Sequence, residues 1–122
     1  MMIKTIDAVN LFDVLQRIGV NKMSIKTAYK LLRNLDKVRY ITEAYGRIEQ
    51  ALVEECRDPD VEIVDGKFAL LPDKIDRFHQ ARKEAGEEMV EVEFEPVSLE
   101  ELEDLEISLE DLDRLRLIIK ED

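Results

Sequence analysis

The sequence contains few of the residues on which catalytic and metal sites depend. Its 122 residues include one histidine, one cysteine, four glycines and no tryptophan. The single cysteine, Cys56, excludes a disulfide within the chain, and one histidine with one cysteine cannot supply a structural zinc site. No glycine-rich loop is present that could cradle a phosphate. We therefore predict that the protein is not an enzyme and that it carries no cofactor and no metal.

Long apolar runs are also missing. No stretch approaches the eighteen consecutive apolar residues of a membrane-spanning helix, and the first residues lead into polar ones, unlike the apolar centre of a signal peptide. We therefore expect a soluble, cytoplasmic protein that does not contact a membrane. With 45% apolar residues the chain can form a core, and its length predicts a single domain, residues 1–122.

Positive charge is absent from one long stretch. Residues 84–113 contain fourteen carboxylates and no Lys, Arg or His, so this stretch carries −14 whereas the whole chain carries −11. Residues 1–83 contain fifteen Lys or Arg and thirteen acids, which gives a net charge of +2. Such an asymmetry of charge indicates which partners the chain can attract, but it does not indicate a catalytic reaction.

Two helices are predicted in the first half of the chain, as a helical hairpin over residues 6–57. Residues 6–18 repeat apolar side chains at spacings of three and four, with Thr5 as the expected cap and Gly19 as the expected stop. The same spacing continues without a proline from Ser24 to about Arg57, which predicts a helix of roughly 50 Å. Gly46 could break or bend this helix, so its continuity stays open.

A hairpin, a helix and a strand are predicted over residues 60–95. Asp65-Gly66 between two short apolar runs, 61–64 and 67–70, is a strong signal for a β-hairpin with a type I′ turn. Residues 72–85 follow as a third helix with Gly86 as its stop. Residues 90–95 alternate apolar and acidic side chains, as a half-buried strand does, and we expect this strand to join the hairpin in a three-stranded sheet.

Two short acidic helices are predicted over residues 98–120. Ser98 and Ser108 each begin the spacing of a capping box, in a repeat of ten residues. The first helix should end near Leu105, and the second should continue through Ile119. The expected fold is therefore α+β: a long helix packed with shorter helices, one β-hairpin plus a third strand, and two short capped C-terminal helices.

The carboxylates of the predicted strand form the first candidate interaction site. Glu91, Glu93 and Glu95 fall on one face and point to solvent, about 6.6 Å apart at roughly 3.3 Å per residue. A regular line of carboxylates can imitate a phosphate backbone and block the DNA-binding groove of another protein. The favoured alternative is that these acids serve solubility and need no partner.

A basic stripe along the long helix forms the second candidate site. Lys22, Lys26, Lys30, Arg33 and Lys37 are spaced by three or four residues, so they share one helix face. Such a stripe can bind nucleic acid by contacting successive phosphates. The favoured alternative is a solvated face, or a face that the acidic C-terminal third neutralises, because a net charge of −11 opposes the approach of nucleic acid.

The only histidine and the only cysteine are both expected to be structural. His79 lies beside Phe78 on a predicted helix, and no local motif supplies a nucleophile for it to activate. We expect it to be exposed or at an edge. Cys56 lies near the end of the apolar stripe of the long helix, so we expect it to be buried.

The order of these segments resembles a family of small proteins encoded by bacteriophages and prophages, mostly of Gram-positive hosts, whose function is unknown. The resemblance spans nearly the whole chain and is most specific at its end. The segments that carry it are SIKTAYKL at 24–31, VEVEFE at 90–95, PVSLEELED at 96–104 and EISLEDL at 106–112. It implies a phage origin, a place in the host cytoplasm and a role without catalysis, but no site residues.

Protein–protein contact is therefore the leading hypothesis for the function of this chain. The long helix has more apolar residues than its neighbours can obviously cover, which predicts a homo-oligomer formed through it. A different phage protein or a host protein is the other expected partner. The two alternatives are an acidic inhibitor that imitates nucleic acid, through Glu91, Glu93 and Glu95, and a weak nucleic-acid binder, through the basic stripe.

Overall fold

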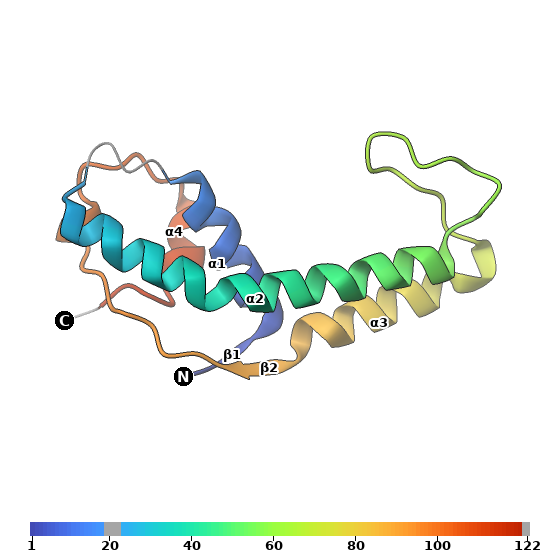
Figure 1. Ribbon diagram of the computed structural model, residues 1–122, viewed down its shortest axis with the longest axis horizontal. Helices are drawn as coiled ribbons and strands as arrows, with labels where there is room; N and C mark the ends of the chain where they lie inside the picture. Colours follow the sequence, from blue (N-terminus) through green and yellow to red (C-terminus); the bar gives the residue numbers. More distant parts are fainter. Residues whose placement is uncertain (19–22, 121–122) are drawn as a thin grey trace.

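The computed structural model describes residues 1–18 and 23–120, and it confirms an α+β fold with one long helix at its centre (Figure 1). The helices are α1 (Thr5–Arg17), α2 (Ile25–Cys56), α3 (Ile75–Glu87) and α4 (Leu109–Leu115). The strands are β1 (Met2–Lys4) and β2 (Met89–Glu91), and single 3-10 turns lie at η1 (Pro72–Lys74) and η2 (Glu100–Leu102).

Helix α2 joins two parts of different thickness (Figure 1). Its first half lies in the thick end, with α1, α4 and the extended segment that follows β2. Its second half lies beside the antiparallel helix α3, and segment 57–71 closes the far end of this pair (Figure 1). We call this second part the arm: α2 from Tyr40 onward, segment 57–71 and α3.

The buried side chains form two clusters that follow this division. The main core fills the thick end, and its buried members are Ile3, Ala8, Leu11, Val14, Leu15, Leu31, Val38, Ile41, Val92, Val97, Leu102, Leu115 and Ile118. The arm has a smaller cluster of Leu52, Cys56 and Phe78, with the ring of Phe68 packed edge-on 5.7 Å from that of Phe78. Cys56 is fully buried, as predicted.

Helix α2 is continuous through Gly46. Its 32 residues correspond to about 48 Å at 1.5 Å per residue. Ser24 caps its start, because the hydroxyl oxygen of Ser24 accepts a hydrogen bond from the N–H of Thr27 at 3.1 Å. The prediction for this helix is confirmed at both ends, and the question of a break at Gly46 is settled in favour of a single helix.

Replacing Gly46 with alanine should raise the free energy of unfolding by about 0.5–1 kcal/mol. An added Cβ would meet no atom within 4 Å, so the substitution restricts the unfolded chain without a clash in the folded one. Urea unfolding at pH 7 measures the change. Gly66→Ala is the matched control and should lower stability, because Gly66 has a φ of +73°. A destabilised Gly46→Ala variant would contradict this account.

The small sheet differs from the predicted one. β2 pairs antiparallel with β1, with Ile3 opposite Val90, and the predicted hairpin is not part of the sheet. The three-stranded prediction is therefore wrong in its partner and in its strand count among the described residues. The physical reason is distance: the hairpin segment closes the far end of the arm, whereas β2 lies where α3 returns to the thick end (Figure 1).

The type I′ turn is confirmed, but the hairpin around it is not. Asp65 and Gly66 both have positive φ, 53° and 73°, as this turn requires. Val64 and Lys67 exchange two backbone hydrogen bonds of 3.0 and 2.9 Å, and the pairing beside the turn stops there. The apolar side chains before the turn are exposed and pack on no core. An isolated two-stranded hairpin is only marginally stable, so without such packing the strands do not extend beyond the turn.

Two predicted helix ends have different roles. Thr5 is the first residue of α1 and does not cap it, because its hydroxyl donates instead to the carbonyl of Glu88 at 2.8 Å. Gly86 lies inside α3 and does not stop it. A Cβ on Gly86 would lie 3.3 Å from the Cβ of Ile6, so this glycine permits the close approach of α3 to α1. Gly19, the expected stop of α1, lies outside the described residues.

Both C-terminal serines cap turns, but the helices are shorter than predicted. Ser98 makes a complete capping box with Glu101, since each accepts from the backbone N–H of the other at 3.2 Å. Only one 3-10 turn follows Ser98, and α4 ends at Leu115. The chain leaves the helix there because its backbone pairs with Val97, whose N–H donates to the carbonyl of Ile118 at 2.7 Å.

Candidate functional site

The acidic strand and the basic stripe, predicted as separate surfaces, face one another. After β2 the chain runs in extended form beside the first half of α2 (Figure 1). The guanidinium of Arg33 donates to the carboxylate of Glu95, and the ammonium of Lys37 donates to the backbone carbonyl of Glu93. The hydrogen bond from Arg33 holds the pKa of Glu95 below its ordinary value.

Glu101 is the most strongly bound carboxylate of this surface. It accepts from the backbone N–H of Ser98, from the hydroxyl of Thr27 at 2.8 Å and from the ammonium of Lys30 at 3.0 Å. These three contacts, in that order, lower the pKa of Glu101 to about 2. Glu101 therefore connects the C-terminal capping box to the first turns of α2 at a side chain that is only 23% exposed.

Asn34 fixes the extended segment at the centre of the same surface. Its side chain is fully buried, its amide donates to the carbonyl of Glu95 at 2.9 Å, and its carbonyl accepts from the N–H of Glu95 at 2.8 Å. The side chain thus pairs with this segment as a neighbouring strand would. The sequence contained a signal for it, because Asn34 is a polar residue at a buried position of the helical repeat, between Leu31 and Val38.

The other members of the two predicted surfaces are less constrained. Lys26 is exposed, and Lys22 lies outside the described residues. The carboxylates of Glu91 and Glu93 accept from the α-amino group of Met1 at 2.6 and 3.1 Å, and this contact lowers the pKa of Glu93. Glu93 remains the most exposed of the three strand acids, with 84% of its side chain accessible.

The structure therefore brings together residues that the sequence suggested for two different partners. Arg33 and Lys37 contact the segment that contains Glu93 and Glu95, and Lys30 contacts Glu101. Three members of the basic stripe, Lys30, Arg33 and Lys37, thus contact the acidic C-terminal third, and for Lys30 and Arg33 this is the neutralised face considered as one alternative above. Glu91, Glu93 and Glu95 do not share one free face, because Glu95 turns toward α2 and is half-buried.

A second ion pair connects α4 to α1. The guanidinium of Arg17 donates to both carboxylate oxygens of Asp111, at 2.9 and 3.0 Å, and to Asp13 at 3.1 Å. The hydrogen bond from Arg17 lowers the pKa of Asp111. Asp111 occupies the position of the second capping box at which an acid would bond back to Ser108. It contacts Arg17 instead, so this box is only half formed.

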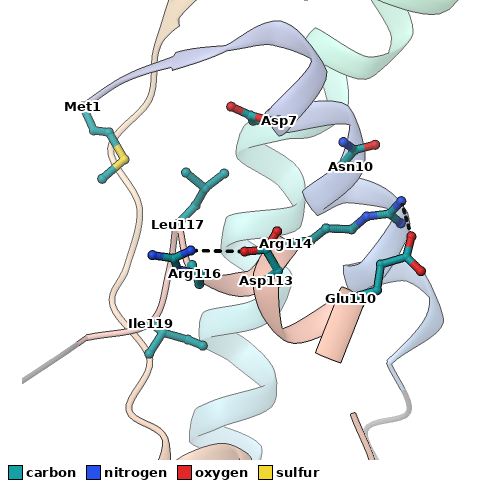
Figure 2. A pocket seen from close by; sticks show the side chains of 9 residues that line it. All are labelled: Met1, Asp7, Asn10, Glu110, Asp113, Arg114, Arg116, Leu117 and Ile119. Carbon is teal, nitrogen blue, oxygen red and sulfur yellow. Dashed lines mark hydrogen bonds and ion pairs between the residues drawn. The ribbon is translucent and has the colours of Figure 1, made fainter. Parts of the chain in front are cut away.

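A hollow of about 740 Å³ lies beside α1 and α4 (Figure 2). Met1, Asp7 and Asn10 line it from the N-terminal part of the chain, and charged and apolar side chains of α4 and the residues after it line the opposite side. Figure 2 shows that these charges pair within the hollow: Arg114 contacts Glu110 at 3.0 Å, and Arg116 contacts Asp113 at 3.2 Å. Charges that satisfy each other in this way leave little affinity for a ligand.

The residues expected to be structural, His79 and Cys56, do not belong to any candidate metal cluster of the described residues. No cluster of three His, Cys, Asp or Glu side chains able to hold a metal ion occurs among residues 1–18 and 23–120. His79 is exposed and contacts the ring of Phe78 edge-on, with ring centroids 5.5 Å apart. Cys56 is buried within the arm and is not accessible as a nucleophile.

An apolar groove on the arm is the feature that the sequence analysis missed. It has a volume of about 370 Å³ and lies between α2 and the end of α3. Its lining is Thr5, Tyr40, Ile41, Ala44, Tyr45, Ile48, Ala85, Glu88 and Val90. The spacing Tyr40, Ala44, Ile48 on α2 could have revealed it as a second apolar stripe, displaced around the helix from the buried one.

Comparisons with known proteins add no relative. The chain matches no protein-family model, no curated protein and no solved structure. In the part of the chain that the structure describes, no helix combines the length and the apolar content needed to cross a membrane.

Proposed function

We propose that this protein acts through protein–protein contacts and associates with itself through the exposed side of α2. The observation that supports the proposal is the exposure of large apolar side chains along one helix. Ile25, Leu32 and Ile48 belong to the apolar stripe predicted for burial, yet Ile25 is 83% exposed and the other two are exposed as well. Tyr29 and Tyr40 extend this surface. Such a series on one element is typical of an interaction surface.

The proposed setting is a bacteriophage or prophage, in the cytoplasm of the host cell. The resemblance of residues 90–112 to small phage proteins supports it. In that setting the chain is an accessory protein, and its partners are a second copy of itself and another phage or host protein.

The two other functions receive less support from the geometry. An inhibitor that imitates nucleic acid needs a free line of carboxylates, but Glu95 is paired with Arg33. A nucleic-acid binder needs free cations, but Lys30 and Arg33 hold carboxylates and Lys37 holds a backbone carbonyl. Either function would first have to break these contacts.

Self-association predicts a particle larger than one chain. Light scattering on a size-exclusion column at micromolar concentration should give a whole-number multiple of 14.2 kDa, and the fraction of the larger species should rise with concentration. A 14.2 kDa species alone, at every concentration up to about 100 µM, would remove the proposal, because an interface that forms the working particle should have a Kd below that value.

A further inference from the structure

We infer that two copies pack antiparallel about the middle of α2, where the arm begins, with Tyr40 of each copy in the groove of the other. The inference rests on the proposed self-association and specifies its surface and orientation. The lining of the groove includes Tyr40 and Ile48 of α2 and the small side chains of Ala44 and Ala85. Tyr40 is 62% exposed, so its ring is available to a second molecule.

The spacing of a large and a small residue gives the register. Tyr40 and Ala44 are four residues apart, or about 6 Å along the axis of α2. If a two-fold axis passes near position 42, each Tyr40 lies over the Ala44 of the other copy. Each copy then contributes the same surface to the interface, as the two-fold symmetry of a closed dimer requires. A large ring over a small side chain also fills the groove without displacing the helices.

The charges beside the groove are self-complementary in this orientation. Asp36, Arg39, Glu43 and Arg47 are all exposed and alternate in sign along α2; Asp36 and Arg39 also form an exposed ion pair of 3.2 Å within the helix, which is weak enough to exchange for contacts with a second copy. An axis within one residue of position 42 places Asp36 opposite Arg47 and Arg39 opposite Glu43. A parallel pair in register would instead place each charge opposite its own kind. The pattern therefore favours a second copy, antiparallel, over an unrelated partner.

A charge-swap series tests the orientation. Asp36→Arg and Arg47→Asp should each weaken self-association by about tenfold or more, because each places like charges opposite one another twice per dimer. The double variant should restore the Kd to within about threefold of the parent, since it re-forms both pairs with reversed polarity. The Kd is measured by sedimentation velocity at pH 7 and 50 mM salt, and circular dichroism confirms the fold of each variant.

Glu103→Arg and Lys120→Asp are the matched controls, because they make the same changes in net charge at exposed positions outside α2 and α3. They should leave the Kd unchanged. A parent protein that stays monomeric would overturn the proposed function and this inference together. A parent that self-associates while the swaps have no effect, or while the double variant fails to recover, would overturn the antiparallel pairing alone and leave self-association through another surface.

Discussion

Replacing Asn34 with alanine should lower the free energy of unfolding by about 3 kcal/mol at pH 7, the largest loss that we expect from any single polar side chain of the described residues. Asn34 is fully buried, and both ends of its amide bond the backbone of Glu95. Alanine removes both hydrogen bonds and leaves the N–H and the carbonyl of Glu95 without these partners. Each unpaired buried group costs about 1–3 kcal/mol.

The loss should extend beyond one contact, because Asn34 holds the segment that carries Val92 and Val97 into the main core. The backbone of segment 92–97 bonds other backbone at its two ends, at Val92 and Val97, and the amide of Asn34 supplies both bonds to Glu95 between them. If the segment moves away, Arg33 also loses Glu95. We therefore expect the unfolding transition to remain cooperative but to move to lower denaturant concentration.

Urea unfolding followed by circular dichroism measures this change. Asn10→Ala is the matched control: it makes the same substitution in the middle of α1, at a half-buried position, and should change stability by less than about 0.5 kcal/mol. Asn34→Asp keeps the size of the side chain but replaces its donor, so it should be at least as harmful as alanine. A loss of less than 1 kcal/mol for Asn34→Ala would show that the segment is held by its apolar residues alone.

The helices were predictable because their signals are local. The apolar spacing of α1 and α2 and the capping by Ser24 depend on residues that lie within one or two turns of each other. Gly46 did not break α2, since a single glycine in an exposed helix costs only about 1 kcal/mol and the packing on both sides exceeds that cost.

The sheet was not predictable in the same way, because its strands are three residues long and 84 residues apart. β1 shows only one buried side chain, Ile3, between two exposed ones, which is too short for a periodic signal. The strong local signal at Asp65-Gly66 did form its turn, yet no packed surface lies beside it to extend the pairing. The turn at Asp65-Gly66 was therefore predicted correctly from local residues, whereas the pairing of the strand at 90–95 with this segment was predicted wrongly.

The contacts of the candidate site also join residues that are far apart in the sequence, and the sequence predicted them only in part. The sequence revealed an acidic third and a basic helix face, and neutralisation of one by the other was among the alternatives. It could not show which carboxylate meets which cation, since that depends on the path of segment 92–97 along α2. Of the acids from Glu84 to Asp113, Glu95, Glu101 and Asp111 bind cations of α1 and α2, and Glu91, Glu93, Glu110 and Asp113 pair with the α-amino group of Met1 or with arginines near their own position. Exposed apolar side chains, in contrast, lie along α2 from Ile25 to Ile48.

The pairing of the acidic third with α2 makes stability depend on pH, and Glu101 should contribute most to that dependence. The folded chain holds the pKa of Glu101 at about 2, below its ordinary value of 4.5. As the pH falls, the unfolded chain therefore takes up the proton first. The stabilisation by Glu101 is complete above about pH 5, decreases between pH 4.5 and 2, and is lost below that range.

Glu101→Gln should accordingly destabilise the protein by about 1–2 kcal/mol at pH 7. The pKa shift corresponds to at most about 3 kcal/mol, and solvent screening of a side chain that is 23% exposed reduces that figure. Glutamine keeps the shape but has one accepting oxygen in place of two, so the variant removes the charge that attracts Lys30 and one of the two acceptors that bond Ser98 and Thr27.

Unfolding curves of the parent and of Glu101→Gln at pH 7, 4.5 and 2.5 measure the effect. The difference in stability between the two proteins should shrink to less than half between pH 7 and 2.5, because the parent then carries a largely neutral Glu101 in its unfolded state. Glu93, Glu95 and Asp111, whose pKa values are also lowered, destabilise both proteins alike over this range and cancel in the difference. Glu100→Gln, an exposed neighbour, is the control and should show little difference at any pH. A difference for Glu101→Gln that stays constant with pH would mean that its hydrogen-bonding shape, and not its charge, joins the acidic third to α2.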